Sequence, residues 1–244
     1  MSALLKAELL KLRTTRTFAA LIGSALALSL ALLVLSGLLT DYNVAEDVRL
    51  LFAGDFTGIF ILLLGAMGMS GEWRHRTITS AVLAAPDRLR LLAAKTLSYA
   101  VAGVVVSFLI TGMLMLIGTI ILSSRDQLTL GSADLIDVMW RNLVVAAYLG
   151  AVGVLVGTIV RSQVGAIIGL IVWFLIVESA LFGLAPDVAK FAPLNGAPGG
   201  IIDVSFDDGD TTLLAPGIAA LVMLGWVTAM FAAGAALIRG RDLT

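Results

Sequence analysis

Six long apolar runs, almost free of charge, dominate this sequence. Each is close to the ~20 residues that a helix needs to cross the hydrocarbon core of a bilayer. Charged residues make up only 14% of the chain and the mean hydropathy is +1.04, so its composition suits lipid better than water. The sequence therefore predicts an all-α membrane protein, a single domain over residues 1–244, with transmembrane helices at about residues 18–39, 50–70, 96–122, 142–160, 164–184 and 214–238.

The basic residues are distributed unevenly between the two sides of such a protein. With the N-terminus inside, the segments 1–17 and 71–95, the connector at Arg161 and the C-terminal tail hold four, five, one and two of the 16 Lys and Arg residues, twelve in all. Cytoplasmic segments carry the excess of Lys and Arg. We therefore expect both termini in the cytoplasm, and a multi-pass protein of the cytoplasmic (inner or plasma) membrane.

The N-terminal segment 2–17 has the pattern of a short amphipathic helix. Leu5, Leu9 and Leu12 recur at helical spacing, with Lys6 and Lys11 beside them. Such a helix lies in the membrane interface and bends into the first span. The alternative is a positive flank that only orients that span.

The segment 71–95, between the second and third spans, has a helix–turn–helix pattern. Residues 72–83 extend the second span inward, and Pro86 ends that helix because the residue before a proline disfavours the helical conformation. Asp87 stands where an N-cap would start the next helix, which becomes the third span. The sequence predicts a short helix near the membrane surface that is tethered at both ends to spans, a shape that can transmit force. The alternative is a loop whose arginines bind anionic lipid head groups.

Glu178, in the fifth span, is the candidate polar residue within the membrane, since it follows the 16 uncharged residues 162–177. A carboxyl group in hydrocarbon is costly, so it faces the protein interior or a cavity. Only about 12 Å of helix separates it from Asp187. This favours a structurally paired or gating carboxyl over a proton relay. Asp55 lies closer to the end of its span and is expected at the interface.

Two pairs of glycines are candidates for close helix packing, because small residues let helix backbones approach in lipid. The pairs flank the short connector 161–163, which predicts a tight antiparallel hairpin of the fourth and fifth spans. The alternative is that they reflect the general abundance of glycine in membrane helices. The residues are Gly153 and Gly157 in one span and Gly165 and Gly169 in the next.

The segment 185–213 connects the last two spans and contains three of the five prolines. Proline does not fit inside a continuous helix without cost. We therefore expect short interfacial helices that are broken at Pro193 and Pro198.

Several kinds of site are excluded by what the sequence lacks. It has no cysteine and a single histidine, His75, which is expected to be a contact residue rather than a metal ligand. It contains neither a phosphate-binding G-x-x-x-x-G-K-[ST] motif nor a catalytic H-E-x-x-H or G-x-S-x-G motif. We expect a chain that is not an enzyme and that binds no metal or cofactor.

The segment between the second and third spans resembles that of the permease subunits of type-two ATP-binding-cassette (ABC) exporters. The shared pattern is a small residue, Glu-[Tyr/Trp]-Arg-x-x-Thr, a Pro-x-x-x-Arg turn and a basic residue that opens the next span. The basic N-terminus, the six spans and the proline-containing segment before the last span extend the resemblance over essentially the whole chain. The matching residues are Gly71, Glu72, Trp73, Arg74, Thr77, Pro86, Arg90 and Lys95.

This resemblance implies a dimer of permeases, identical or paralogous, that binds two copies of a separate ATPase. ATP and Mg²⁺ would be bound by that ATPase, and no nucleic acid is involved. It also implies that the segment after the second span, between spans two and three, includes a coupling helix that docks in a groove of the ATPase. It leaves the exported substrate open. The implied coupling residues are Glu72, Arg74, His75, Arg76, Thr77, Pro86, Arg88 and Arg90.

Two other classes remain open. One is a membrane scaffold or sensor subunit that transports nothing. The other is a secondary transporter, which is disfavoured because the expected spans carry only Asp55 and Glu178, with no basic residue to form an ion-coupling pair.

Overall fold

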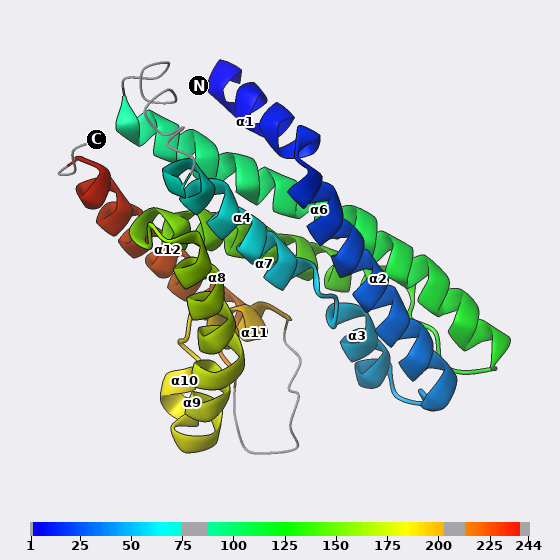
Figure 1. Ribbon diagram of the computed structural model, residues 1–244. Helices are drawn as coiled ribbons and strands as arrows, with labels where there is room; N and C mark the ends of the chain where they lie inside the picture. The colour runs from blue at the N-terminus through cyan, green and yellow to red at the C-terminus, as the bar shows by residue number, and fades with distance from the viewer. Residues whose placement is uncertain (1, 75–86, 203–212, 240–244) are drawn as a thin grey trace.

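The computed structural model describes residues 2–74, 87–202 and 213–239, and all regular structure in these ranges is helical (Figure 1). Six helices or helix combinations are long and apolar enough to cross a membrane, which confirms the predicted all-α class with six candidate spans. They are α2 (Arg16–Leu39), α3 with α4 (Ala45–Ala53 and Thr57–Arg74), α6 (Arg88–Ser124), α7 (Ser132–Ile159), α8 with its continuation (Gln163–Val172 and on to Leu184) and α12 (Pro216–Arg239).

The helix ends gather at two opposite ends of the molecule (Figure 1). α1 (Ser2–Thr14), the end of α4, the start of α6 and the end of α12 lie at one of them, which we call the α1 end. α3 lies at the other, the α3 end, together with α9 (Glu178–Leu184) and α10 (Pro186–Ala189). α1 packs against α6, so the predicted N-terminal helix exists and lies against protein.

The second apolar run is not one continuous helix. α3 stops at Ala53 and α4 starts at Thr57. The backbone N–H of Phe56 donates to Ser29 Oγ at 3.0 Å, and that of Thr57 donates to Asp55 Oδ1 at 3.1 Å. Side chains therefore replace the helical hydrogen bonds at the break, which corrects the expected single helix over 50–70.

The third span is longer than its apolar run. α6 begins at Arg88 and has 37 residues, which is about 55 Å of helix. Asp87 is its N-cap, and the Asp87 carboxylate accepts from the backbone N–H groups of Leu89 at 3.1 Å and Arg90 at 3.2 Å. The predicted N-cap is confirmed.

α7 is the most buried span, and α4 and α6 pack along it at very short range. A Cβ atom added to Gly153 would lie 2.1 Å from the carbonyl oxygen of Leu62 on α4, and one added to Gly157 would lie 2.5 Å from that of Ala66. Any side chain at these two positions would force the helices apart. The first glycine pair thus faces α4.

The second glycine pair faces no helix of this chain among the described residues. The three atoms nearest to a Cβ atom added to Gly165 belong to Ser162 and Val160, and a Cβ atom added to Gly169 would meet nothing within 4 Å. α8 packs mainly along α4 rather than along α7. The tight hairpin expected for the fourth and fifth spans is therefore wrong: the connector is short, but α8 turns away from α7.

The fifth span contains a π-helical turn, Trp173–Val177, before α9 (Glu178–Leu184). Two short helices follow, α10 (Pro186–Ala189) and α11 (Gly196–Ile202). Pro193 separates them as expected. The expected break at Pro198 is wrong, because Pro198 lies in the first turn of α11, where a missing backbone N–H costs no helical hydrogen bond.

Candidate functional site

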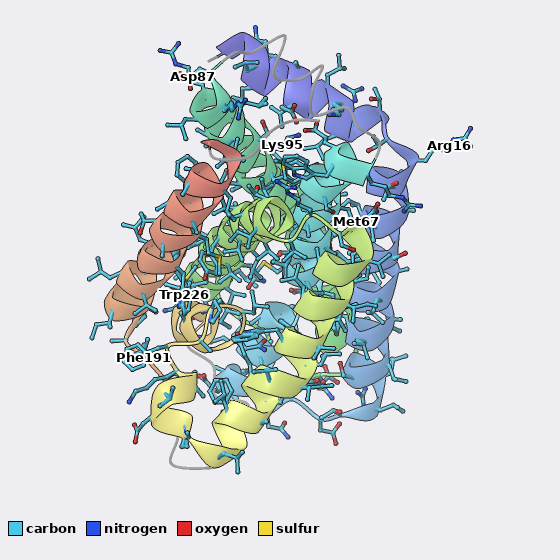
Figure 2. The ribbon with its side chains drawn as sticks, turned by 60° about the vertical axis from the view of Figure 1, so that its left-hand side comes forward. Arg16, Met67, Asp87, Lys95, Phe191 and Trp226 are labelled. Carbon is cyan, nitrogen blue, oxygen red and sulfur yellow. The ribbon has the colours of Figure 1, made fainter. Side chains whose placement is uncertain are left out.

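A group of four charged residues, three of them buried and the fourth, Lys11, half-exposed, joins three helices at the α1 end. Lys95 of α6 donates to Glu8 of α1 at 2.6 Å and to Glu72 of α4 at 2.9 Å, and Lys11 of α1 also donates to Glu72. We call these four residues the ionic cluster. Two positive and two negative groups balance each other, and Figure 2 shows Lys95 beneath α1.

The ionic cluster changes how Glu72 and Lys95 are interpreted. Lys95 is 1% exposed and Glu72 is 3% exposed. A buried charge must be paired, so the two residues hold α4 and α6 together on either side of the segment 75–86. Glu72, expected as a docking contact, faces α1 and α6 here. Its role in coupling to a partner stays a prediction.

One expectation is wrong as a result. The candidate spans do contain a basic residue in an ion pair, since Lys95 lies within α6 and binds Glu72 of α4. The sequence analysis placed Lys95 at the start of the third span and did not identify Glu8 and Glu72 as its partners. A signal was present, because Glu8 is the one acidic residue in the basic segment 1–17.

The other predicted coupling residues in the described ranges differ in exposure. Arg88 donates to the backbone oxygen of Ile238 at 2.7 Å, and so caps the C-terminal end of α12. Arg90 pairs with Asp87 at 3.0 Å on the surface, with 74% of its side chain exposed. Arg74 is also exposed. His75, Arg76, Thr77 and Pro86 lie outside the described residues, as does most of the predicted coupling helix.

Two contacts tie the end of α4 to the connector between α7 and α8. Arg74 Nη1 donates to Gln163 Oε1 at 3.2 Å. The guanidinium of Arg161 lies 4.8 Å from the ring centroid of Trp73, within range of a cation–π interaction. The basic connector thus contacts the end of α4.

Glu178 is fully buried and forms the centre of a second polar group, at the α3 end. Its carboxylate accepts from the indole N–H of Trp173 at 2.8 Å, from the backbone N–H of Leu194 at 2.9 Å, and from that of Asn195. The Asn195 side chain in turn donates to the backbone oxygen of Phe174 at 2.9 Å, in the π turn. Glu178 therefore ties the chain before α11 to the fifth span.

Asp55 occupies the break between α3 and α4 and faces α6 and α7. Its carboxylate accepts from Thr57 N–H, from the hydroxyl of Thr111 and, at 3.4 Å, from the Asn142 side chain. Asn142 also donates to the backbone oxygen of Phe52 at 3.1 Å. The two amide contacts hold α7 against the broken span.

A cavity of about 700 Å³ lies between these two polar groups. Its walls come from the start of α4, from α7, from the π turn with α9, and from α11. Both Asp55 and Asn195 line it. Among the described residues, no three His, Cys, Asp or Glu side chains lie close enough to hold a metal ion.

Comparison with known proteins adds no family, since no protein-family model and no curated protein matches this sequence. The six candidate spans support a multi-pass helical membrane protein.

Proposed function

We propose that this chain is the permease subunit of an ABC exporter of the cytoplasmic membrane. Two permeases would form the transport unit with two copies of a separate ATPase, which supplies ATP hydrolysis. Both termini would be cytoplasmic, which places the α1 end on the ATPase side. The observation that carries the proposal is the ionic cluster, because it clamps together the two helices that lead into and out of the basic segment 71–95.

The mechanism follows from this clamp. Closure of the ATPase pair on ATP would push on the segment 71–95. Because Glu72 and Lys95 are ion-paired, the displacement would be shared by α4 and α6 rather than absorbed by one helix. A partner shifts such an equilibrium only through contacts that differ between two states. The docked segment would supply those contacts.

The exposed arginines are the better docking candidates in the described part of this surface. Arg74 and Arg90 present their guanidinium groups at the α1 end, while Arg88 is engaged with α12. In the complex these side chains would form ion pairs removed from water, and loss of one partner of such a pair costs about 2–5 kcal/mol of binding free energy. In the free chain they are surface charges, which contribute only about 0–1 kcal/mol to the stability of the fold. Reversal of the exposed charges should therefore release the ATPase and leave the fold intact.

The test is co-purification of an ABC ATPase with the tagged permease from cells that make this protein. Arg74→Glu with Arg90→Glu should lose the ATPase and transport, while the protein still inserts and elutes normally in detergent. Lys190→Glu, which reverses a charge at the α3 end in a side chain that is 22% exposed, is the control. If the double variant keeps the ATPase and transport but loses binding to anionic lipid, the segment is a lipid anchor and the proposal fails.

The secondary-transporter alternative is not favoured by the newly found ion pair. Lys95 lies seven residues into α6, about 10 Å from its start at the α1 end. Ion-coupling sites of secondary transporters lie near the bilayer midplane. A scaffold or sensor subunit is distinguished from a permease by the ATPase activity of the purified complex. Only the complex of a permease would hydrolyse ATP at a rate that changes when a transported compound is added.

A further inference from the structure

The 700 Å³ cavity at the α3 end has the size and lining of a ligand site. Binding sites for small molecules typically span about 300–1,000 Å³, with apolar walls and a few fixed polar groups. Here the walls include Phe56, Phe174 and Phe182, and the polar groups include Asp55 and Asn142. The described residues that line the cavity include no Lys, Arg or His.

Asp55 brings a carboxylate to this wall without a basic partner. Its three hydrogen-bond donors are a backbone N–H, a hydroxyl and an amide, which carry no positive charge. It has no ion pair with any residue that the structure describes. Removing an ionised group from water is costly unless an opposite charge accompanies it. A ligand that carries a positive charge would supply that charge.

The aromatic lining favours the same kind of ligand. The faces of phenylalanine rings attract cations, and clusters of aromatic side chains recognise quaternary ammonium groups. Most of the remaining lining residues are apolar, with Leu194 and Ile202 among them, and the polar ones, Ser179 and Asn195, are uncharged. An anion would face Asp55 without compensation, and a sugar chain would leave its hydroxyls unpaired against these walls.

We propose that the cavity binds an amphiphilic monovalent cation, with its apolar body among the phenylalanines and its charge beside Asp55. The binding itself needs only this chain. That such cations are the exported substrates rests on the proposed function above. Glu178 is not an equivalent site, because three N–H donors already occupy its buried carboxylate.

The test compares two ions of nearly the same shape and opposite charge, tetraphenylphosphonium and tetraphenylborate. Their binding is measured to the purified chain in discs of zwitterionic lipid, with empty discs subtracted. Tetraphenylphosphonium should bind saturably and at least about tenfold more tightly than tetraphenylborate, given the loss expected for an unpaired charge. This comparison uses the unaltered protein and does not depend on whether a variant folds.

Variants then locate the site. Asp55→Asn should weaken tetraphenylphosphonium binding about tenfold, whereas Asp187→Asn, on exposed α10, should leave it unchanged. Ser179→Phe, which places a ring at the cavity wall, should also weaken it. Thermal unfolding and gel filtration identify any variant that is misfolded.

Three results would overturn the inference: equal affinity for the two ions, no saturable binding above empty discs, or wild-type affinity in folded Asp55→Asn. These outcomes are separable from failure of the exporter proposal. Cation binding without a co-purifying ATPase would refute the exporter alone. A bound ATPase without cation binding would refute this site alone.

Discussion

Lys95 allows the sharpest test of the ionic cluster, because its ammonium group binds the carboxylates of both Glu8 and Glu72. Lys95→Met keeps an unbranched apolar chain of similar length and removes only the charge. Glu72 would retain Lys11, but Glu8 would lose the one ion-pair partner that it has among the described residues. Removing one partner of a buried ion pair costs about 3–5 kcal/mol. We expect Lys95→Met to lower the free energy of unfolding by about 3 kcal/mol or more.

Two controls bracket this value. Lys190→Met breaks the ion pair with Asp187, whose side chain is 93% exposed, and should cost about 0–1 kcal/mol. Glu8→Met combined with Lys95→Met removes both charges and should be more stable than Lys95→Met alone, since apolar replacement of a whole buried pair is often neutral.

The measurement is unfolding by SDS in mixed micelles, followed by the fluorescence of the four tryptophans. If Lys95→Met unfolded at the same mole fraction of SDS as Lys190→Met, the ionic cluster would not stabilise the fold. If instead the double variant were less stable than Lys95→Met, Glu8 would stabilise the fold through contacts other than its ion pair with Lys95.

Three further predictions use other parts of the structure. Gly153→Ala should destabilise the protein strongly, because its Cβ would lie 2.1 Å from the Leu62 oxygen. Gly169→Ala has open space around its Cβ and should be neutral or stabilising by up to about 1 kcal/mol. Unfolding by SDS compares the two variants. Glu178→Ala should cost at least about 2 kcal/mol in the same assay, because it leaves three N–H donors without an acceptor; a loss below that of Lys190→Met would contradict this role. Single cysteines at Asp87 and Ser162 should react with an impermeant reagent from one side of the membrane, and those at Ser132 and Asp187 from the other side. Labelling of all four positions from the same side would disprove the six spans.

The sequence predicts those features that local chemistry decides. Apolar runs of spanning length predict six spanning helices, whatever the contacts between them. An Asp that follows a proline and precedes a helical run predicts the N-cap at Asp87. The break at Asp55 also had a local signal, because Gly54 precedes it and Thr57 follows within reach of its carboxylate. That signal was outweighed by the apolar character of the whole run.

The sequence does not predict contacts between residues that are distant along the chain. Glu8 and Lys95 are 87 residues apart, and each reads as an ordinary charge at the edge of an apolar run. Likewise Glu178 is recognisable as a costly carboxyl, but its partners at Leu194 and Asn195 depend on how α10 and α11 fold back onto the π turn. The direction of α8 is set by packing on α4 rather than by the length of its connector.

α4 links the two sites that these contacts create. Its first residue, Thr57, hydrogen-bonds Asp55 at the cavity, and Glu72 near its other end belongs to the ionic cluster. Between them, α4 packs on α7 so closely that Gly153 and Gly157 leave no room for a side chain. Interfaces packed in this way move as rigid bodies and do not deform continuously. A displacement at the cluster would therefore reach the cavity through α4 and α7 together.

The looser fifth span is then the part expected to move when a ligand or the ATPase binds. Only 11% of its apolar window is buried, against 72% for α7. Because the chain has no cysteine, spin labels can be placed in pairs at exposed positions. The distance from Gly71 on α4, where an added Cβ atom would meet nothing within 4 Å, to Trp140 on α7 should stay constant between states, while that from Trp140 to Ile176 in the π turn should change. A change in the first distance as large as that in the second would refute the rigid α4–α7 unit.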